Sequence, residues 1–340
     1  MRARLPLSRP LPGPGPGPGN APLSCEDMDD APPASARPSP RDLPGSGRRE
    51  FPFHRRHFDL IARMLYQLAG IALAPHKVEM VYSRLARRLR DLRLPDFDSY
   101  CALLEGEDGA AEVGYLVNAL TTNLTSFYRE AHHFEFLAHH ALPEFRARNA
   151  RSHIHPGPHP GSPAPHPTRP RLRIWSAGCS SGPEPYTIAM VLASTLGAEL
   201  PHWDARILAT DIDTHMVETA RRGVYPAEMT SGIPPAVRDR FTHRTRDRGE
   251  PAVAMDDALR RLITFKPLNL LEPWPMKGPF DAIFCRNVLI YFDRPGRMKV
   301  IDQFARMLPP DRYLFLGHSE SLYGVSSRFR QVGPTIYQRV

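Results

Sequence analysis

A turn rich in small residues, between a short apolar stretch and a helix-like stretch, is the first feature that suggests chemistry. Residues 174–186 read IWSAGCSSGPEPY, and TIAMVLAS follows them. A strand–turn–helix unit of this kind is typical of nucleotide binding. The two glycines, Gly178 and Gly182, are however four residues apart, and Glu184 lies where a carboxylate would repel a diphosphate. This turn therefore suits a ligand with a sulfonium and a cationic amino-acid end.

Two further polar positions follow predicted strands. Asp211 comes after ILAT, about 30 residues beyond the turn, and CRN comes after FDAIF. In open α/β sheets the ligand lies beyond the carboxyl ends of the strands, and an acid there accepts hydrogen bonds from ribose hydroxyls. This pairing alone fits either NAD or S-adenosylmethionine. Glu184, together with LNLL at 268–271 where an adenine contact is expected, favours S-adenosylmethionine.

The segment after the FDAIFC strand narrows the choice of methyl acceptor. Enzymes that methylate exocyclic amines of bases commonly carry Asn/Asp-Pro-Pro-aromatic there, whereas this chain reads RNVLIYFD. A carboxylate acceptor is a better nucleophile, needs no general base and depends mainly on positioning in line with the methyl group. The sequence therefore points away from methylation of bases, without naming the acceptor.

The elements that must position these residues alternate between strands and helices after Arg171. Strands are predicted at RLRIWSA, ARILATD, FDAIFCRN, RYLFLGH and TIYQRV, and helices at 186–197, THMVETARRG and RPGRMKVIDQFARML. This alternation predicts a doubly wound, Rossmann-like α/β domain over residues 171–340. Residues 224–265 are polar and end in RRLITF, and they predict a small inserted antiparallel β-subdomain.

Helical periodicity predicts a small N-terminal helical domain over residues 51–148. Apolar residues recur every three or four positions in HKVEMVYSRLARRLRDL. Further helices are predicted near 97–105, near 110–120 and from Arg129 to about Pro143.

Two Pro-rich segments flank this domain. Residues 1–50 include GPGPGPG, and we predict that they are disordered because they bury too little apolar surface to offset the entropy of ordering. Residues 149–170 form a Pro/His-rich linker, whose four histidines lack the spacing of a metal site. We therefore expect no bound metal.

Composition limits the class of protein. The net charge is +8 and the pI is about 9.5, which fits either a polyanionic partner or a solvated basic surface. The four cysteines lack metal spacing, and no apolar run approaches the roughly 18 residues of a membrane span. We expect a cytoplasmic protein with reduced thiols that does not insert into a membrane.

The order and spacing of several motifs resemble one family, the bacterial chemotaxis receptor glutamate O-methyltransferases, or CheR family. The resemblance extends from about Phe53 to the C-terminus, apart from the linker. The segments that carry it are MVYSRLARRLR, LTTNLTSFYREAHHF, WSAGCSSGPEPY, ATDIDT, LNLL, GPFDAIFCRNVLIYFD and LFLGHSES. It implies that a monomeric enzyme methylates glutamates on the cytoplasmic signalling helices of receptors. It also implies S-adenosylmethionine as donor, S-adenosylhomocysteine as product and no bound nucleic acid.

The resemblance also implies roles for individual residues. Those expected to close over the cofactor from the helical domain are Asn123, Thr125 and Arg129. The remaining cofactor positions are Glu184, Asp211, Asn269, Leu270, Cys285, Arg286 and Asn287. The expected catalytic residues are Arg129 and Tyr291, which matches a tyrosine near the transferred methyl group. The arginines expected to dock the receptor are Arg84, Arg87, Arg88, Arg90 and Arg93, and a helical wheel places Arg84, Arg87 and Arg90 away from the apolar stripe.

The chain departs from the family pattern in three places: Pro183 in the turn, the long linker and the N-terminal extension. In some members the inserted subdomain binds a receptor's C-terminal peptide, and this sequence leaves that open. The alternatives are a nucleic-acid methyltransferase, disfavoured by the absent Pro-Pro motif, and a non-catalytic adaptor, disfavoured by the intact cofactor positions. An enzyme that methylates a different acidic protein also remains open.

Overall fold

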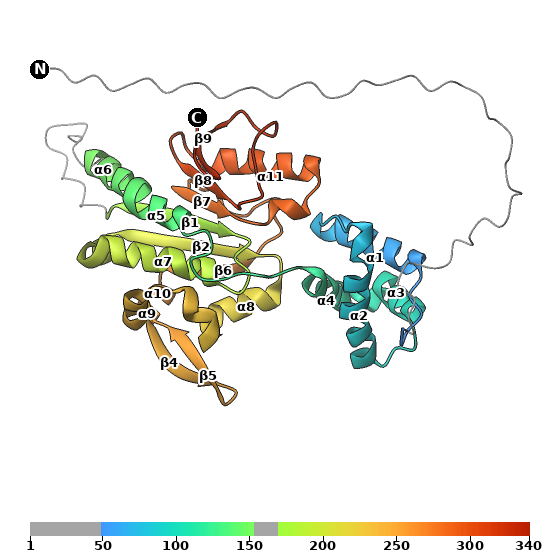
Figure 1. The fold of residues 1–340 in the computed structure, drawn as a ribbon. Coiled ribbons are helices and arrows are strands. Elements are labelled where there is room, and N and C mark those ends of the chain that lie inside the picture. Colours follow the sequence, from blue (N-terminus) through green and yellow to red (C-terminus); the bar gives the residue numbers. More distant parts are fainter. Residues whose placement is uncertain (1–48, 153–168) are drawn as a thin grey trace, which may run out of the picture. The chain divides into compact units, whose positions relative to one another are not determined.

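The computed structural model describes residues 49–152 and 169–340. The expected disordered extension, except its last two residues, and most of the Pro/His-rich linker lie outside the described residues. Figure 1 shows the described elements, coloured along the sequence.

Four helices form the N-terminal helical domain. They are α1 (Arg55–Ala69), α2 (Val78–Leu92), α3 (Phe97–Glu105) and α4 (Ala110–Leu120). Gly70 ends α1 in the left-handed region with φ 66°, and its N–H donates to the carbonyl of Tyr66. The apolar stripe of α2 faces a shared core, whose buried members include Ile61, Leu65, Val81, Leu85, Leu89, Tyr100 and Leu116.

The next helix belongs to a different core from the one that the sequence suggested. It consists of α5 (His132–Phe136), a π-helical segment η3 (Leu137–Ala141) and α6 (Leu142–Ser152). Its apolar residues are buried against the α/β sheet, among them Phe134, Leu137 and Phe145. The helical domain therefore ends near Leu120 and not at residue 148. The helix also continues beyond Pro143, directly after a π-helical turn in which the N–H of Leu142 donates to the carbonyl of Leu137.

A seven-stranded sheet forms the centre of the C-terminal domain, in the order β6-β2-β1-β7-β8-β10-β9. The parallel strands are β1 (Arg171–Ala177), β2 (Asp204–Asp211), β6 (Ile263–Pro267), β7 (Ala282–Cys285) and β8 (Tyr313–Leu316). The last two strands, β9 (Phe329–Gly333) and β10 (Ile336–Arg339), are antiparallel. The strand predicted at TIYQRV is thereby confirmed as β10.

Helices cover both faces of this sheet. Leu172 and Ile174 of β1 share a core with α5, α6, α7 (Pro183–Leu196) and α8 (Thr214–Arg222), whereas Trp175 packs with α11 (Arg294–Met307). Because successive side chains of a strand point to opposite faces, β1 is buried on both sides. The predicted doubly wound α/β fold is confirmed.

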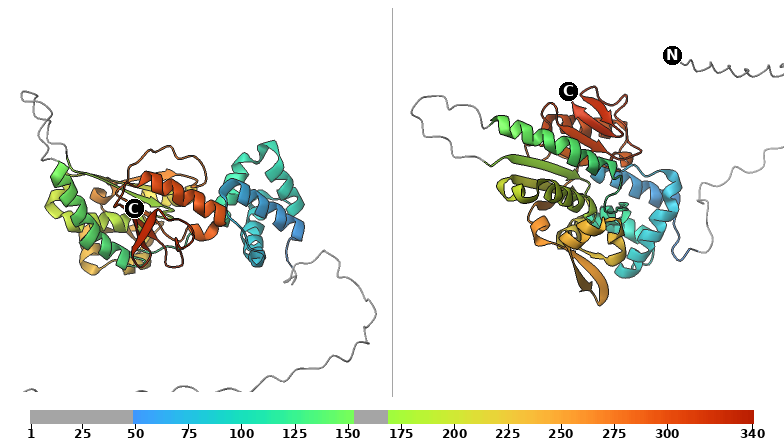
Figure 2. Two further views of the ribbon diagram at one scale, coloured as in Figure 1. Left: turned by 90° about the horizontal axis from the view of Figure 1, so that it is seen from above. Right: turned by 60° about the vertical axis from the view of Figure 1, so that its left-hand side comes forward.

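The inserted subdomain is smaller than the sequence suggested. A separate antiparallel sheet has the order β3-β5-β4, with β3 (Val224–Pro226), β4 (Thr242–Asp247) and β5 (Glu250–Met255), beside α9 (Pro235–Phe241) and α10 (Asp257–Arg260). The segment ITF, expected at the end of the insert, belongs to β6, an edge strand of the main sheet. Figures 1 and 2 show the insert near the β6 edge of the main sheet, whereas β8 and β9 lie toward its opposite edge with α11 beside them.

Short 3₁₀ helices connect several of these elements. They are η1 (Pro75–Lys77), η2 (Glu107–Gly109), η4 (Gly197–His202), η5 (Ala227–Gly232) and η6 (Leu289–Tyr291).

Candidate active site

A cavity of about 350 Å³ opens at the carboxyl ends of the parallel strands. Its walls come from the ends of α1 and α4, the extended segment 121–126, the glycine turn and the segments after β2, β6 and β7. Every predicted cofactor residue except one lines it: Asn123, Thr125, Arg129, Glu184, Asp211, Asn269, Leu270, Arg286 and Asn287. Tyr291 lines the same cavity.

The glycine turn brings the backbone close to its neighbours. Gly178 has φ 89°, and a Cβ atom there would lie 2.3 Å from Cγ2 of Val288. Gly182, which caps α7, has φ 105°, and its Cβ would lie 2.5 Å from the hydroxyl of Tyr225. Both positions therefore require glycine. The turn is fixed to β2 by the N–H groups of Gly178 and Cys179, which donate to the carbonyl of Thr210.

Asp211 ends β2, and its carboxylate organises the two segments beside it. It accepts hydrogen bonds from the backbone N–H of Ser180 at 2.7 Å and of Asp213 at 2.9 Å. Burial raises the pKa of Asp211 to about 6, although the backbone hydrogen bonds oppose this rise. Each carboxylate oxygen has a second lone pair, so Asp211 can still accept a hydrogen bond from a ribose hydroxyl.

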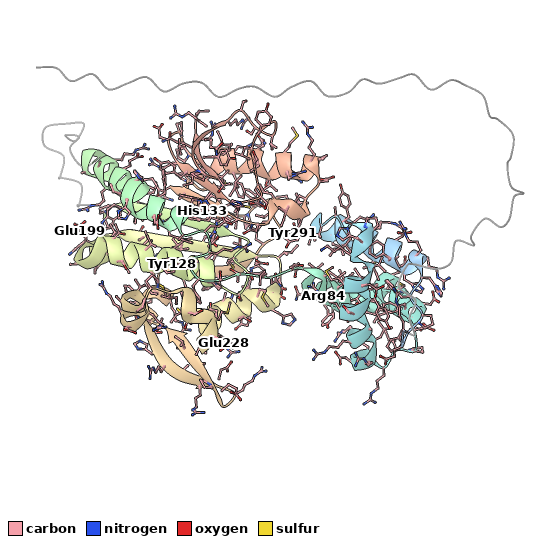
Figure 3. All side chains as sticks on the ribbon, viewed as in Figure 1. Arg84, Tyr128, His133, Glu199, Glu228 and Tyr291 are labelled. Carbon is pink, nitrogen blue, oxygen red and sulfur yellow. The ribbon has the colours of Figure 1, made fainter. Side chains whose placement is uncertain are left out.

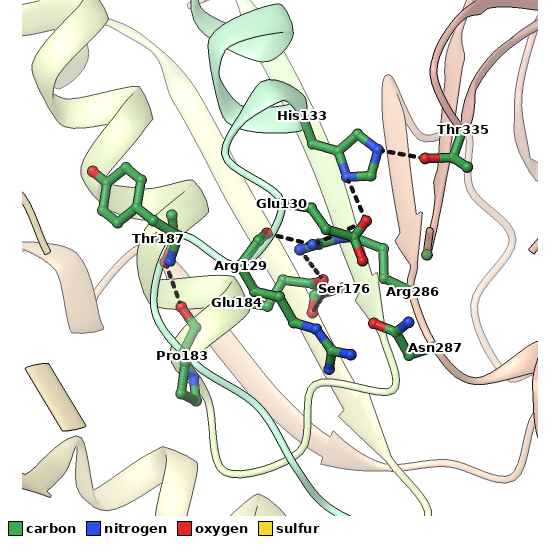
Figure 4. Close-up of polar contacts among 12 residues, drawn as sticks. Arg129, Glu130, His133, Ser176, Pro183, Glu184, Thr187, Arg286, Asn287 and Thr335 are labelled. Atoms are coloured by element: carbon green, nitrogen blue, oxygen red, sulfur yellow. Dashed lines mark hydrogen bonds and ion pairs between the residues drawn. The ribbon is translucent and has the colours of Figure 1, made fainter. Parts of the chain in front are cut away.

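A buried polar cluster surrounds Glu184 and Arg286, which line the cavity (Figure 4). The Ser176 hydroxyl donates to Glu184 Oε1 at 2.6 Å, and Nη1 of Arg286 lies 3.2 Å from Glu184 Oε2. Nη2 of Arg286 donates to the carbonyl of Arg129 and lies 3.4 Å from Oε2 of Glu130. Burial raises the pKa of Glu184, and the charge of Arg286 partly offsets that rise. Arg286 thus forms ion pairs with two carboxylates, those of Glu184 and Glu130.

His133 extends this cluster toward the C-terminal strands. Its Nε2 lies 2.9 Å from the Thr335 hydroxyl, and its Nδ1 lies 3.6 Å from Oε2 of Glu130. Burial and the nearby charge of Arg286 lower the pKa of His133 to about 3. The imidazole is therefore neutral at physiological pH and adds no positive charge to the cluster.

A single carboxylate holds the loop after β7. Glu320 is buried and accepts hydrogen bonds from the N–H groups of Asn287, Val288, Leu289 and Gly317, at 2.6–2.9 Å. Asn287 is held in the left-handed region with φ 59°. This loop leads directly into the 3₁₀ helix that carries Tyr291, so Glu320 fixes the backbone that precedes the predicted catalytic tyrosine.

Tyr291 contacts the helical side of the cavity (Figure 3). Its hydroxyl donates to the carbonyl of Thr122 at 3.3 Å, and its own carbonyl accepts the N–H of Ala72 at 3.0 Å. Burial raises the pKa of Tyr291, so the phenol remains a neutral donor. Asn123 donates to Oδ2 of Asp213 at 2.7 Å and joins the extended segment to the α/β domain.

Some of the predicted residues lie elsewhere. The Cys285 side chain is buried in the core that contains Trp175, and it does not line the cavity. Arg84 donates to the carbonyls of Ala119 and Thr121, at 3.0 and 2.7 Å. Arg88 pairs with the buried carboxylate of Glu112, 2.7 Å away, and lies over the ring of Tyr115.

The docking interpretation of Arg84 and Arg88 is therefore corrected. A helical wheel separates the apolar stripe from the other positions of a helix. It does not show whether a polar side chain on those positions is already bonded to neighbouring backbone, as Arg84 is, or to a buried acid, as Arg88 is. Arg87, Arg90 and Arg93 are exposed, and Arg90 makes an exposed ion pair with Glu50 at 3.6 Å.

Several residues of the site received no role from sequence reasoning. They are Glu130, Ser176, Asp213 and Glu320. Glu130 and Glu320 lie within the quoted segments LTTNLTSFYREAHHF and LFLGHSES. Those segments carry the family resemblance and could have pointed to the two residues. A single acidic residue, however, has no periodicity that would predict its burial.

The residues of the cavity fit S-adenosylmethionine by their chemistry. Asp211 offers acceptors for ribose hydroxyls, and the carboxylates beside Arg286 suit a cationic end. Oε2 of Glu130 is buried without a hydrogen-bond partner in the described chain, and its ion pair with Arg286, at 3.4 Å, is shared with Glu184. Among residues 49–152 and 169–340, no three or more His, Cys, Asp or Glu side chains gather in a way that could hold a metal ion.

Ionisation of Asp211 is expected to control cofactor affinity. Above its pKa of about 6 the carboxylate can accept charge-assisted hydrogen bonds from ribose hydroxyls, and below that pKa the neutral carboxyl is a weaker acceptor. Affinity for S-adenosylhomocysteine should therefore fall as the pH decreases from 8 to 5. Asp211→Ala should weaken binding at pH 8 by about tenfold or more, because a hydrogen bond to a charged group contributes about 1.5–3 kcal/mol.

Calorimetry at several pH values checks both expectations. The pH dependence should be weaker in Asp211→Ala than in the unaltered protein. An unchanged affinity at pH 8 would remove Asp211 from the ribose site.

The fold and the site together define a class. A sheet of this order, with five parallel strands and two antiparallel ones, a glycine turn after its first strand and an acid at the end of its second are the features of an S-adenosylmethionine-dependent methyltransferase. The chain belongs to the CheR methyltransferase family: residues 123–338 match "CheR methyltransferase, SAM binding domain" and residues 56–121 match "CheR methyltransferase, all-alpha domain". The boundary between these matches agrees with the two cores and with the end of α4.

Named relatives support this assignment. The chain is 43% identical to "Chemotaxis protein methyltransferase" from Escherichia coli K12 over 282 residues, which cover 83% of this chain and 90% of the relative. It is 41% identical to "Chemotaxis protein methyltransferase 2" from Pseudomonas aeruginosa over 301 residues, covering 88% and 99%. The predicted family, fold class and methyl donor are confirmed. Within the described residues, no helix has both the length and the apolar character that crossing a membrane requires.

Proposed function

We propose that this protein transfers the methyl group of S-adenosylmethionine to glutamate carboxylates of chemotaxis receptors. The observation that carries the proposal is the absence of a free base among the described residues that line the cavity. Those residues include no histidine, and their carboxylates, Glu184 and Asp211, are both engaged. An amine near its usual pKa of about 10 would have to lose a proton first, whereas a glutamate is already ionised at neutral pH.

Positioning is then the main task of the protein. Arg129 lines the cavity and is anchored by a hydrogen bond from Nη1 to the carbonyl of Leu124 at 3.0 Å. The remaining guanidinium donors are suited to orient a carboxylate, either of the acceptor or of the cofactor. Tyr291 offers a neutral hydroxyl on the same wall. Alignment of two reactants can contribute on the order of 7–11 kcal/mol in favourable cases.

The relatives' names and the exposed arginines of α2 support the choice of receptors as partners. Arg87, Arg90 and Arg93 present positive charge near the end of this helix, where acidic receptor helices would dock. This proposal places the enzyme in the cytoplasm as a monomer that does not act on nucleic acid.

Charge reversal on α2 tests the docking surface. Arg87→Glu combined with Arg90→Glu should lower kcat/KM for receptors by about tenfold at low salt, because like charges slow association. The difference should shrink at high salt, where exposed charges are screened. S-adenosylhomocysteine affinity should remain unchanged.

The double change Arg297→Glu with Arg330→Glu, at two exposed positions on α11 and β9, serves as a charge-matched control. Equal losses in both double variants would point to a general charge effect and would contradict docking at α2.

The reaction itself is tested by incubation with methyl-labelled S-adenosylmethionine and receptor signalling domains. The labelled product should release methanol in mild alkali, because methyl esters hydrolyse under these conditions and N-methyl groups do not. Peptide mapping should then place the label on glutamates. A label that survives alkali would indicate an amine acceptor and would refute the proposal.

A further inference from the structure

The shared arginine of the active site leaves a charge unbalanced. Glu184 and Glu130 both approach Arg286, at 3.2 and 3.4 Å, and the Arg286 side chain is only 3% exposed. His133, beside them, is neutral because burial keeps its pKa low. Two carboxylates and one guanidinium sum to one negative charge.

Glu130 contributes to this cluster more as a charge than as a hydrogen-bonding group. Its Oε1 accepts the backbone N–H of His318 at 3.1 Å, but its Oε2 is buried and has no hydrogen-bond partner in the described chain. Burying a carboxylate oxygen without a hydrogen bond costs free energy, and the ion pair with Arg286, at 3.4 Å, is shared with Glu184. A cationic ligand in the adjoining cavity would supply the missing positive charge and would offset this cost.

We propose that Glu130 makes the site discriminate between the cationic methyl donor and the neutral-sulfur product. Glu184 lines the cavity, and Glu130 shares with it the only positive charge buried in the cluster. Ligand sulfur is positive in S-adenosylmethionine and uncharged in S-adenosylhomocysteine. The attraction of the unbalanced charge therefore favours the donor and weakens when the methyl group has left, which promotes exchange of product for donor.

Arg129 does not cancel this effect. Its backbone carbonyl accepts a hydrogen bond from Arg286, and its guanidinium is directed toward Leu124 and the cavity. A ligand that carries its own α-carboxylate can pair with that guanidinium in both donor and product, so this interaction is common to the two ligands. The two ligands therefore still differ in the charge of their sulfur atom.

The test compares two affinities in several variants and needs no acceptor protein, so it is independent of the proposed function. Glu130→Gln should weaken S-adenosylmethionine binding by about tenfold and S-adenosylhomocysteine binding by less than about threefold, both measured by calorimetry. Glu130→Ala, a second neutral variant, should shift the ratio in the same direction. Glu130→Asp keeps the charge and should largely keep the ratio.

Glu135→Gln is the matched control, because it removes an exposed charge from α5, five residues further along the chain. It should change neither affinity. Thermal melting confirms that each variant is folded before the affinities are compared. Equal losses of affinity for both ligands in Glu130→Gln would mean that Glu130 only supports packing. Unchanged affinities would mean that the charge of Glu130 is irrelevant to binding. Either result overturns the proposal.

Discussion

Replacing Glu320 by leucine is expected to lower the free energy of unfolding by about 4 kcal/mol or more and to abolish methyl transfer. Four backbone N–H groups would lose their common acceptor. Each buried donor that is left unsatisfied costs about 1–3 kcal/mol. Urea unfolding, followed by circular dichroism, measures the change.

Glu199→Leu provides the comparison. Glu199 is half exposed and makes only a surface ion pair with Arg146, so its replacement should change stability by less than about 0.5 kcal/mol. If Glu320→Leu were equally mild, water would have to satisfy the loop, and the structural role assigned to Glu320 would be wrong.

A milder change separates the loop from the rest of the fold. Glu320→Gln keeps the shape but turns one acceptor into a donor that would face backbone N–H groups. The loop is tightly packed, since a Cβ atom at Gly317 would lie 2.5 Å from Nδ2 of Asn287. Displacement of this loop should move Tyr291 and lower kcat.

The parts of the site that could be predicted from the sequence lie at the carboxyl ends of strands. Glu184, Asp211 and Arg286 follow or adjoin β1, β2 and β7, which are neighbours in a parallel sheet. Parallel strands bring their carboxyl ends to one edge, so their order in the sequence predicts a shared site. The resemblance added Asn123, Thr125 and Arg129, which no pattern of spacing would have linked to that edge.

The remaining features depend on tertiary contacts. The helix that contains Phe134 and Phe145 has a helical pattern, but periodicity does not indicate which core buries its apolar face. The two apolar residues of ITF, Ile263 and Phe265, are too few to distinguish an edge strand of the main sheet from part of the insert. Glu130 and Glu320 are single acids whose burial depends on distant backbone and on Arg286.

The polar cluster also explains why a basic protein has an acidic site. The chain carries a net charge of +8, yet Arg286 is the only arginine or lysine buried in the described α/β domain. Buried carboxylates there are Glu184, Asp211, Asp213 and Glu320. Under the proposed function, positive charge on the surface would favour encounter with acidic partners, and negative charge inside would favour a cationic ligand.

Arg286→Met should therefore be among the most damaging single changes in this domain. Methionine fills a similar volume but leaves Glu184 and Glu130 without a cation. Removing one partner of a buried ion pair costs about 3–5 kcal/mol. We expect a loss of stability in this range at pH 8, measured by urea unfolding, together with loss of binding to S-adenosylhomocysteine.

The loss should depend on pH in a defined direction. Burial already raises the pKa of Glu184, and without Arg286 that pKa should rise further. A carboxyl group whose pKa is higher in the folded state than in the unfolded state contributes stability below its unfolded-state pKa of about 4.3. This contribution is lost as the pH rises through the folded-state pKa. Arg286→Met should thus be closer to the unaltered protein in stability at pH 5 than at pH 8. Arg294→Met, at an exposed position, should show no such dependence, and a pH-independent loss in Arg286→Met would show that the arginine contributes packing and not charge.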